Sequence, residues 1–169
     1  PNLIMVPPQY EQYLKYSKLT RAIYQRYTDQ VEPYGMDECW LDITGSQHIC
    51  GDGMEAAERI RRTVKQELGL TVSIGVSYNK IFAKLGSDMK KPDAITEITK
   101  KNFKEKVWPL PASDLLYVGR ATTAKLARYG IHTIGDIAAA DPKWYFYISW
   151  WFGQHLQQWR ADLMQFLSL

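Results

Sequence analysis

Two adjacent carboxylates, Asp37 and Glu38, lie between two short runs of strand-forming residues, 31–34 and 39–43. At a tight turn between strands both side chains can approach one point, where their hard oxygens suit Mg²⁺. Two such ions can activate a 3′-hydroxyl and neutralise a triphosphate during in-line phosphoryl transfer. A solvated turn that binds nothing is the competing interpretation, because an Asp-Glu pair alone is weak evidence for a site.

Lys90 and Lys91 stand between an expected helix and an expected strand, directly before Pro92. Lysines at a helix end often only complement the helix dipole. The same placement can also direct an ammonium group at a phosphate. Both interpretations stay open on these residues alone.

A third segment begins with Gly119 and Arg120 and continues into a short helical pattern that carries Lys125 and Arg128. A glycine before a helix leaves backbone N–H groups free to bind an anion. The pattern 118–137 looks like a helix-hairpin-helix, a module that grips the DNA backbone without reading its sequence. Simple helix capping is the alternative explanation.

Hydrophobic periodicity predicts the elements that position these residues. Between residues 10 and 98 their order is α-β-β-α-β-α-β, with helices over 10–28, 54–68 and 79–90 and strands over 31–34, 39–43, 70–76 and 94–98. One strand placed before the first helix would complete β-α-β-β-α-β, the ferredoxin-like order. The expected fold class is therefore α+β, with the first strand lacking in this chain.

Several local signals support individual helices. Asp52 is a plausible N-cap and Gly69 a C-cap for the second helix. Ser113 or Asp114 could cap a turn further along the chain. The first helix is indicated by residues that recur three and four positions apart: Tyr13, Tyr16, Leu19, Ile23 and Tyr27.

Composition sets limits on the class of protein. The 169 residues carry a net charge of +3, and 46% of them are hydrophobic, as in a soluble globular protein. The longest apolar-aromatic stretch, 144–153, is about half the length that a membrane-spanning helix needs, which argues against an integral membrane protein. Two cysteines form no disulfide framework, Cys39 is expected in the core, and His48-x-Cys50 lacks the second ligand pair of a structural zinc site.

The basic excess is local. Residues 100–130 contain seven Lys/Arg and two Asp/Glu, a net charge of +5, whereas the segments 1–99 and 131–169 each carry −1. The basic stretch is either a polyanion-binding surface or a solvated face. A domain boundary is expected near residue 100. Four of the six tryptophans lie in 144–159, which is either the core of a small all-α subdomain or an interface with another domain.

Three motifs together resemble those of the Y-family translesion DNA polymerases, especially the bacterial DNA polymerase IV and UmuC-like branch (the ImpB/MucB/SamB class). Residues 34–44 (YGMDECWLDIT) resemble the family's second acidic motif, and residues 73–92 (SIGVSYNKIFAKLGSDMKKP) resemble the long signature that follows it. Residues 118–136 are similar to the family's thumb. The motifs keep the family's order and spacing, and the resemblance covers roughly residues 1–140.

The resemblance implies roles for individual residues. Asp37 matches the family's second metal-binding aspartate, and Glu38 matches the adjacent catalytic glutamate. Lys91 matches the lysine that contacts the incoming triphosphate, and Lys84 lies in a loop-helix segment near substrate or primer. The implied cofactor is a pair of Mg²⁺ ions, and the implied partners are primer-template DNA and a deoxynucleoside triphosphate. A sliding clamp would bind through a region outside this chain, and whether one does so stays open.

The resemblance also implies a domain order: residues 1–7 end the fingers, 8–99 form the catalytic palm, and 100–169 form an all-α thumb with the helix-hairpin-helix. Gly119, Arg120, Lys125 and Arg128 would contact DNA there. The family's first motif, most of its fingers and its little-finger domain are not matched, so we expect a partial chain with an incomplete metal site that is inactive alone. The intact protein is expected in the cytoplasm, at the nucleoid.

One departure concerns the thumb hairpin. Tyr117 stands where the family usually has the first glycine of the motif. A tyrosine has a Cβ and resists positive φ, which predicts a distorted hairpin.

Two other functions compete with the polymerase. The chain could be a non-catalytic module that binds damaged DNA through its basic thumb. It could also be another enzyme with a ferredoxin-like palm, such as a nucleotide cyclase, although the 73–92 signature argues against this.

Overall fold

A computed structural model describes residues 3–140 of the chain, so the aromatic segment 144–159 lies outside the described residues. The chain divides into two compact units, Pro1–Lys100 and Lys101–Leu169, which are described separately here. The assignment of these units as palm and thumb stays a prediction. No helix among residues 3–140 is long and apolar enough to cross a membrane.

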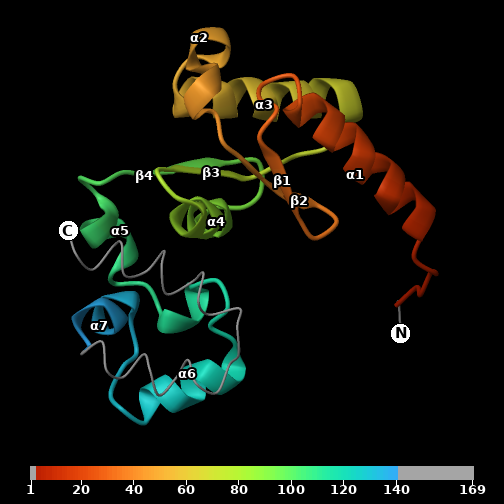
Figure 1. Ribbon diagram of the computed structural model, residues 1–169. Coiled ribbons are helices and arrows are strands. Elements are labelled where there is room, and N and C mark those ends of the chain that lie inside the picture. Colours follow the sequence, from red (N-terminus) through yellow and green to blue (C-terminus); the bar gives the residue numbers. More distant parts are fainter. Residues whose placement is uncertain (1–2, 141–169) are drawn as a thin grey trace. The chain divides into compact units, whose positions relative to one another are not determined.

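The strands of the first unit form two pairs (Figure 1). β1 (Val31–Tyr34) and β2 (Glu38–Leu41) are antiparallel, whereas β3 (Ile74–Ser77) and β4 (Ile95–Ile98) are parallel. Within residues 3–140 no strand ladder joins the two pairs. The α/β character is thus as predicted, but the single ferredoxin-like sheet is not formed by these strands alone. The third strand also begins at Ile74 rather than at residue 70.

Two long helices pack beside the strands. α1 spans Tyr10–Tyr24 and α3 spans Gly53–Leu68, with η1 (Thr44–Ser46) and the short α2 (Gln47–Cys50) before α3. The predicted caps of α3 are confirmed. The Asp52 carboxylate accepts hydrogen bonds from the N–H groups of Met54 and Glu55, both at 2.9 Å, and the Glu55 side chain completes a capping box. Gly69 ends the helix in the left-handed conformation, with φ 66°.

The core of the first unit joins α1 and α3 through four buried residues: Ile23, Tyr24, Ile60 and Val64. Residues of both strand pairs pack against this cluster, namely Val31, Cys39, Leu41 and Ile74. Cys39 therefore lies at the core margin and is half-buried, while Cys50 is buried; both are free thiols. One hydrophobic cluster, formed by α1 and α3, is thus in contact with residues of both strand pairs.

The spacing correctly predicts a helix, but only part of the stripe on α1 is buried. Tyr13, Tyr16 and Leu19 are 52%, 38% and 39% exposed. The reason is the position of α1 relative to α3. Only the end of α1 that carries Ile23 and Tyr24 is buried, and its N-terminal turns extend away from α3 (Figure 1).

α4 (Lys80–Met89) lies on the side of the β3–β4 pair opposite to α3 (Figure 1). The Asn79 side chain caps it by accepting a 2.8 Å hydrogen bond from the Phe82 N–H. The helix approaches β3 closely at Gly75, where a Cβ would lie 1.8 Å from the Ala83 carbonyl oxygen. Glycine at this position is therefore what allows α4 to pack directly on the strand.

Between residues 101 and 140, the second unit contains four short helical elements: α5 (Phe103–Val107), η2 (Ala112–Asp114), α6 (Arg120–Ala127) and α7 (Ile134–Ala139). Its core is formed by Val107, Ala112, Leu115, Val118, Leu126, Ile134 and Ile137. The expected cap by Ser113 or Asp114 is not formed, because η2 begins after Pro111 without a side-chain cap.

Candidate functional site: a charged hairpin and an ion-pair chain

The carboxylates Asp37 and Glu38 lie where the β1–β2 hairpin turns into β2. Asp37 is exposed in the turn and Glu38 is the first residue of β2. The turn is held from α1, since the Arg21 guanidinium donates to the Gly35 carbonyl at 2.9 Å and the Ser17 hydroxyl donates to the Met36 carbonyl. These bonds fix the backbone directly before the two carboxylates.

A second set of contacts ties the hairpin to α4. The Trp40 indole N–H donates to the Lys80 carbonyl at 3.0 Å, and the Lys80 ammonium stands 5.5 Å from the centre of a Trp40 ring. The same ammonium pairs with Glu32 on β1. The hairpin and the start of α4 are thus joined by an aromatic contact, a hydrogen bond and an ion pair.

One turn further along α4, Lys84 reaches the hairpin carboxylate. Its Nζ lies 2.9 Å from Glu38 Oε1 and 2.5 Å from Asp88 Oδ2. Asp88 in turn holds Lys91, whose Nζ lies 2.6 Å from Asp88 Oδ1. Glu38, Lys84, Asp88 and Lys91 therefore form one chain of alternating charge. Three of these four residues are the ones that the sequence assigned to the metal, to the substrate region and to the triphosphate.

The pKa values agree with charged forms for the two central members of this chain. Burial acts to lower the pKa of Lys84, but its hydrogen bonds to Asp88 and Glu38 outweigh burial and raise that pKa. Burial acts to raise the pKa of Asp88, but the Lys84 and Lys91 ammonium groups hold it below its usual value. Lys84 is therefore a cation and Asp88 an anion at neutral pH.

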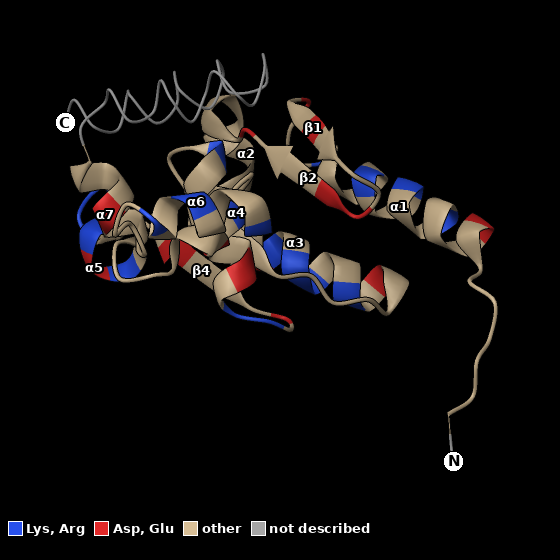
Figure 2. Ribbon diagram, turned by 90° about the horizontal axis from the view of Figure 1, so that it is seen from below, with Lys and Arg blue, Asp and Glu red and all other residues tan. Residues whose placement is uncertain are grey.

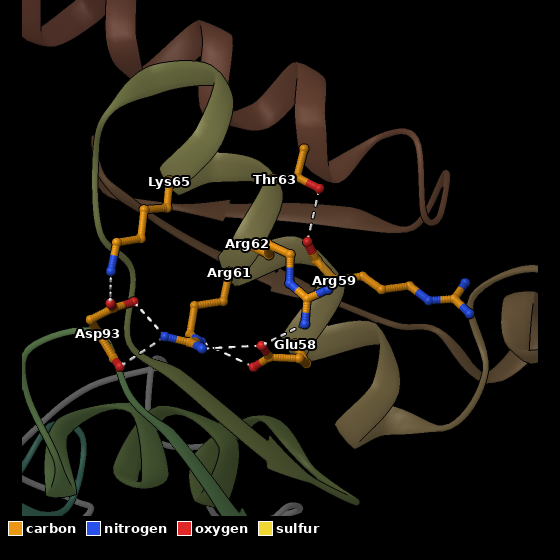
Figure 3. Close-up of polar contacts among 7 residues, drawn as sticks. All are labelled: Glu58, Arg59, Arg61, Arg62, Thr63, Lys65 and Asp93. Atoms are coloured by element: carbon orange, nitrogen blue, oxygen red, sulfur yellow. Dashed lines mark hydrogen bonds and ion pairs between the residues drawn. The ribbon is translucent and has the colours of Figure 1, made fainter.

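The loop after α4, which carries Lys91, is anchored to α3 by Asp93 (Figure 3). The Asp93 carboxylate lies 2.9 Å from Arg61 Nη1 and 2.6 Å from Lys65 Nζ. Arg61 also pairs with Glu58 at 3.1 Å. These cations hold the pKa of Asp93 below its usual value. The loop is thus held at two points, by the pair of Lys91 with Asp88 at the end of α4 and by the pairs of Asp93 with α3.

The residues at the hairpin fit part of a Mg²⁺ site. Mg²⁺ is commonly held by one or two carboxylates, with water and substrate phosphates completing its shell, and Asp37 and Glu38 are hard-oxygen donors at an accessible turn. The Lys84 ammonium already stands beside Glu38 as a resident cation. Within residues 3–140 no group of three or more His, Cys, Asp or Glu side chains could hold a metal ion. The carboxylates can therefore supply two ligands, with the others coming from elsewhere.

The predicted DNA-binding residues of the second unit share α6. Gly119 is its N-cap residue, Arg120 is its first residue and is exposed, and Lys125 and Arg128 lie at its end. The structure describes these four residues within a single unit. Figure 2 shows the basic positions of α6 in blue.

Backbone hydrogen bonds and the N-terminal capping box of α7 stabilise the hairpin between α6 and α7. The Asp136 carboxylate accepts from the N–H groups of His132 and Thr133 at 3.0 and 2.8 Å, and these bonds hold its pKa below the usual value. Tyr117, before the motif, adopts φ 70°, in the left-handed region that glycine prefers. The predicted conflict at Tyr117 is therefore present in the backbone, while the hairpin itself keeps its capping box at Thr133.

Sequence reasoning missed two residues that organise this site, Asp88 and Asp93. Asp88 lay inside the quoted signature without a role. Its spacing of four residues after Lys84 and three before Lys91 was the available signal, because such residues are neighbours on a helix. The pairing of Asp93 with α3 has no sequence signal, because Asp93 lies 28 positions after Lys65 and 32 positions after Arg61.

Comparison with known proteins gives consistent matches. Residues 1–88 match the model of a family described as impB/mucB/samB family. A protein named DNA polymerase IV from Acetivibrio thermocellus is 56% identical over 138 residues, which are 82% of this chain and 35% of that protein. A DNA polymerase IV from Clostridium kluyveri is 42% identical over 144 residues, 85% of this chain and 36% of that protein. The chain thus spans about a third of the length of these relatives.

Solved structures show the same similarity of fold. A Y-family DNA polymerase chimera superposes with a TM-score of 0.82 at 24% identity, covering 98% of this chain and 47% of the other. A crystal structure described as a DinB family error-prone DNA polymerase from Sulfolobus solfataricus gives a TM-score of 0.72 at 26% identity, covering 82% and 42%. Another similar structure is described as an insertion ternary complex of Dbh DNA polymerase, with a TM-score of 0.81, 24% identity and coverage of 96% and 46%.

Proposed function

Because the chain belongs to the impB/mucB/samB family, we propose that it forms the palm and thumb of a Y-family translesion DNA polymerase. The first unit would be the catalytic palm and the second unit the thumb. Such a protein would add deoxynucleotides to a primer across damaged template. A cytoplasmic location at the nucleoid would follow from that role.

The observation that carries the proposal is the ion-pair chain from Glu38 to Lys91. It links a carboxylate suited to a metal with a lysine suited to a phosphate, through contacts of 2.9, 2.5 and 2.6 Å. Nucleotidyl transfer needs both kinds of group close to one triphosphate. A solvated turn would not require the hairpin carboxylate to be joined to the phosphate-binding lysine through α4.

The chemistry assigned to each residue follows from its charge and place. Asp37 and Glu38 would hold Mg²⁺, which supplies charge neutralisation for the triphosphate and a more acidic primer 3′-hydroxyl. Lys91 would bind an oxygen of the incoming triphosphate as a point charge. Before metal and nucleotide bind, the Lys84 ammonium would neutralise the charge of Glu38. After they bind, Lys84 would stay near the primer end. Arg21, which donates to the Gly35 carbonyl, would keep the turn that carries both carboxylates in place.

The second unit would hold the duplex through its phosphates. Arg120 and Arg128 on α6 are exposed, and backbone N–H groups at the Gly119 end of the helix can bind phosphate oxygens. Binding of this kind depends strongly on salt and little on sequence.

Primer extension by the full-length protein that contains this chain tests the proposal. Glu38→Ala should abolish incorporation while DNA affinity stays within about twofold, because thumb contacts to phosphates dominate DNA binding. Glu32→Ala is the matched control, since Glu32 lies on the same hairpin and, within residues 3–140, forms an ion pair with Lys80 rather than with Lys84. Full activity of Glu38→Ala would contradict the assignment. DNA binding without any primer extension by the unsubstituted full-length protein would favour the non-catalytic module.

The isolated chain should not extend a primer, because its described carboxylates supply only part of a two-metal site. Mg²⁺-dependent extension by these 169 residues alone would overturn this expectation.

A further inference from the structure

Asp88 occupies a position that helix electrostatics disfavours. It is the penultimate residue of α4, which ends at Met89. The C-terminal end of a helix carries partial negative charge, so a carboxylate in the last turn is repelled rather than stabilised. The helix itself therefore gives no reason for an acidic residue at this point.

The contacts of Asp88 supply the reason. Each of its two carboxylate oxygens meets a different ammonium, Oδ2 that of Lys84 at 2.5 Å and Oδ1 that of Lys91 at 2.6 Å. The two lysines differ in their surroundings, since the Lys84 side chain is 17% exposed and the Lys91 side chain 56%. Lys84 is thus fixed by packing and by Glu38, whereas Lys91 depends on Asp88 for its orientation.

Lys91 lies beyond the helix, where the backbone does not orient its side chain. The C-cap residue Lys90 is already extended, with φ −134° and ψ 119°. The ion pair with Asp88 draws the Lys91 ammonium back over the end of α4, on the side where Lys84 meets the hairpin. A lysine has three N–H donors, so Lys91 can keep its bond to Asp88 and still donate to a phosphate.

We propose that Asp88 is a positioning residue for the incoming nucleotide, which holds the Lys91 ammonium in place for the triphosphate and, through Lys84, aligns it with Glu38. This inference rests on the proposed function. A long, exposed lysine loses much rotational freedom when it binds a ligand, and prior fixation by Asp88 reduces that loss. The benefit therefore concerns nucleotide binding more than the chemical step.

Asp88→Asn in the full-length protein tests the role of the charge with little change of shape. We expect the KM for the deoxynucleotide to rise about fivefold, as for the loss of an exposed ion pair, while kcat changes less than about twofold. The urea midpoint should fall only slightly, because the substitution removes two ion pairs but also a carboxylate from a helix C-terminus. Glu32→Gln is the control, since it breaks the Lys80 pair between the same hairpin and α4, and it should leave KM unchanged.

A double-mutant cycle separates positioning from a general structural role. In a Lys91→Gln background, Asp88→Asn should raise KM no further, because the residue that Asp88 positions is already lost. Asp88→Ser, a second uncharged variant, should behave as Asp88→Asn does. If Asp88→Asn and Lys91→Gln raised KM independently, so that their fold-changes multiplied, the proposal would be overturned. An unchanged KM in Asp88→Asn alone would overturn it too. A lower KM in Asp88→Asn would also overturn it, by showing that Asp88 competes with the triphosphate. A wild-type protein that extends no primer would contradict the proposed function instead.

Discussion

Gly75→Ala probes the packing that places α4, and with it Lys84, against the rest of the site. A Cβ at Gly75 would lie 1.8 Å from the carbonyl oxygen of Ala83 and 2.6 Å from the amide nitrogen of Ser87. Both are main-chain atoms of α4, so neither can rotate away. Since ordinary contacts begin near 3.4 Å, the helix must move away from β3 by about 1.6 Å.

The size of the effect follows from this displacement. Overpacking of this kind typically costs about 1 to 3 kcal/mol, and the backbone clash places Gly75→Ala at the upper end. Alanine recovers about 0.5 to 1 kcal/mol because it loses less chain entropy than glycine on folding. The expected net loss is about 2 kcal/mol, which lowers the Tm of a unit of this size by about 10 °C. Movement of α4 would also lengthen the 2.9 Å contact between Lys84 and Glu38.

Urea and thermal unfolding of the 169-residue chain, followed by far-UV circular dichroism, measure this loss. Gly45→Ala is the matched control in the same unit, because a Cβ there meets nothing within 4 Å. Gly86→Ala should fall between the two, since its Cβ would lie 3.2 Å from the Gly75 Cα. If Gly75→Ala were as stable as Gly45→Ala, the close packing of α4 on β3 would be refuted.

Three further predictions concern single side chains. Tyr117→Gly should be more stable than Tyr117→Ala by about 0.5 to 1 kcal/mol in urea titrations, because both variants lose the same side chain and only glycine accepts φ 70° without strain; equal stabilities would contradict this. Lys65 and Arg61 lower the pKa of Asp93, so its stabilising effect is present at neutral pH and is lost as the pH falls below about 5 towards that lowered pKa. Asp93→Asn should therefore flatten the acid limb of a stability-pH curve, and an unchanged limb would argue against the ion pairs. Replacing Lys125 and Arg128 by Gln should reduce the slope of log DNA affinity against log salt by about two, and an unchanged slope would remove α6 from the DNA interface.

The parts of the fold that sequence predicts correctly are those with local causes. The α3 boundaries follow from Asp52 and Gly69, whose capping roles depend only on neighbouring residues. Burial along α1 is not local in this sense, because the exposure of Tyr13 or Leu19 depends on how far α3 extends beside that helix. Periodicity shows that a stripe exists but does not show which part of it is covered.

The same distinction applies to the site. The motifs identify Asp37, Glu38 and Lys91 as separate candidates, but the contacts that link Glu38 to Lys91 depend on the tertiary structure. The contact between Glu38 and Lys84 joins positions 46 residues apart and needs the hairpin to lie against α4. Asp88 becomes recognisable only once both of its lysines are seen in contact with it.

The most direct test of the central claim is single-nucleotide incorporation by the full-length protein carrying Asp37→Asn. This substitution keeps the size of the side chain but removes the negative charge that a metal ligand needs. Asp29→Asn is the control, since Asp29 is also an exposed aspartate of the first unit. The account predicts that Asp37→Asn lowers the incorporation rate at least about a hundredfold, with DNA affinity and the rate of Asp29→Asn unchanged. A wild-type rate for Asp37→Asn would contradict the assignment of this hairpin as the catalytic centre.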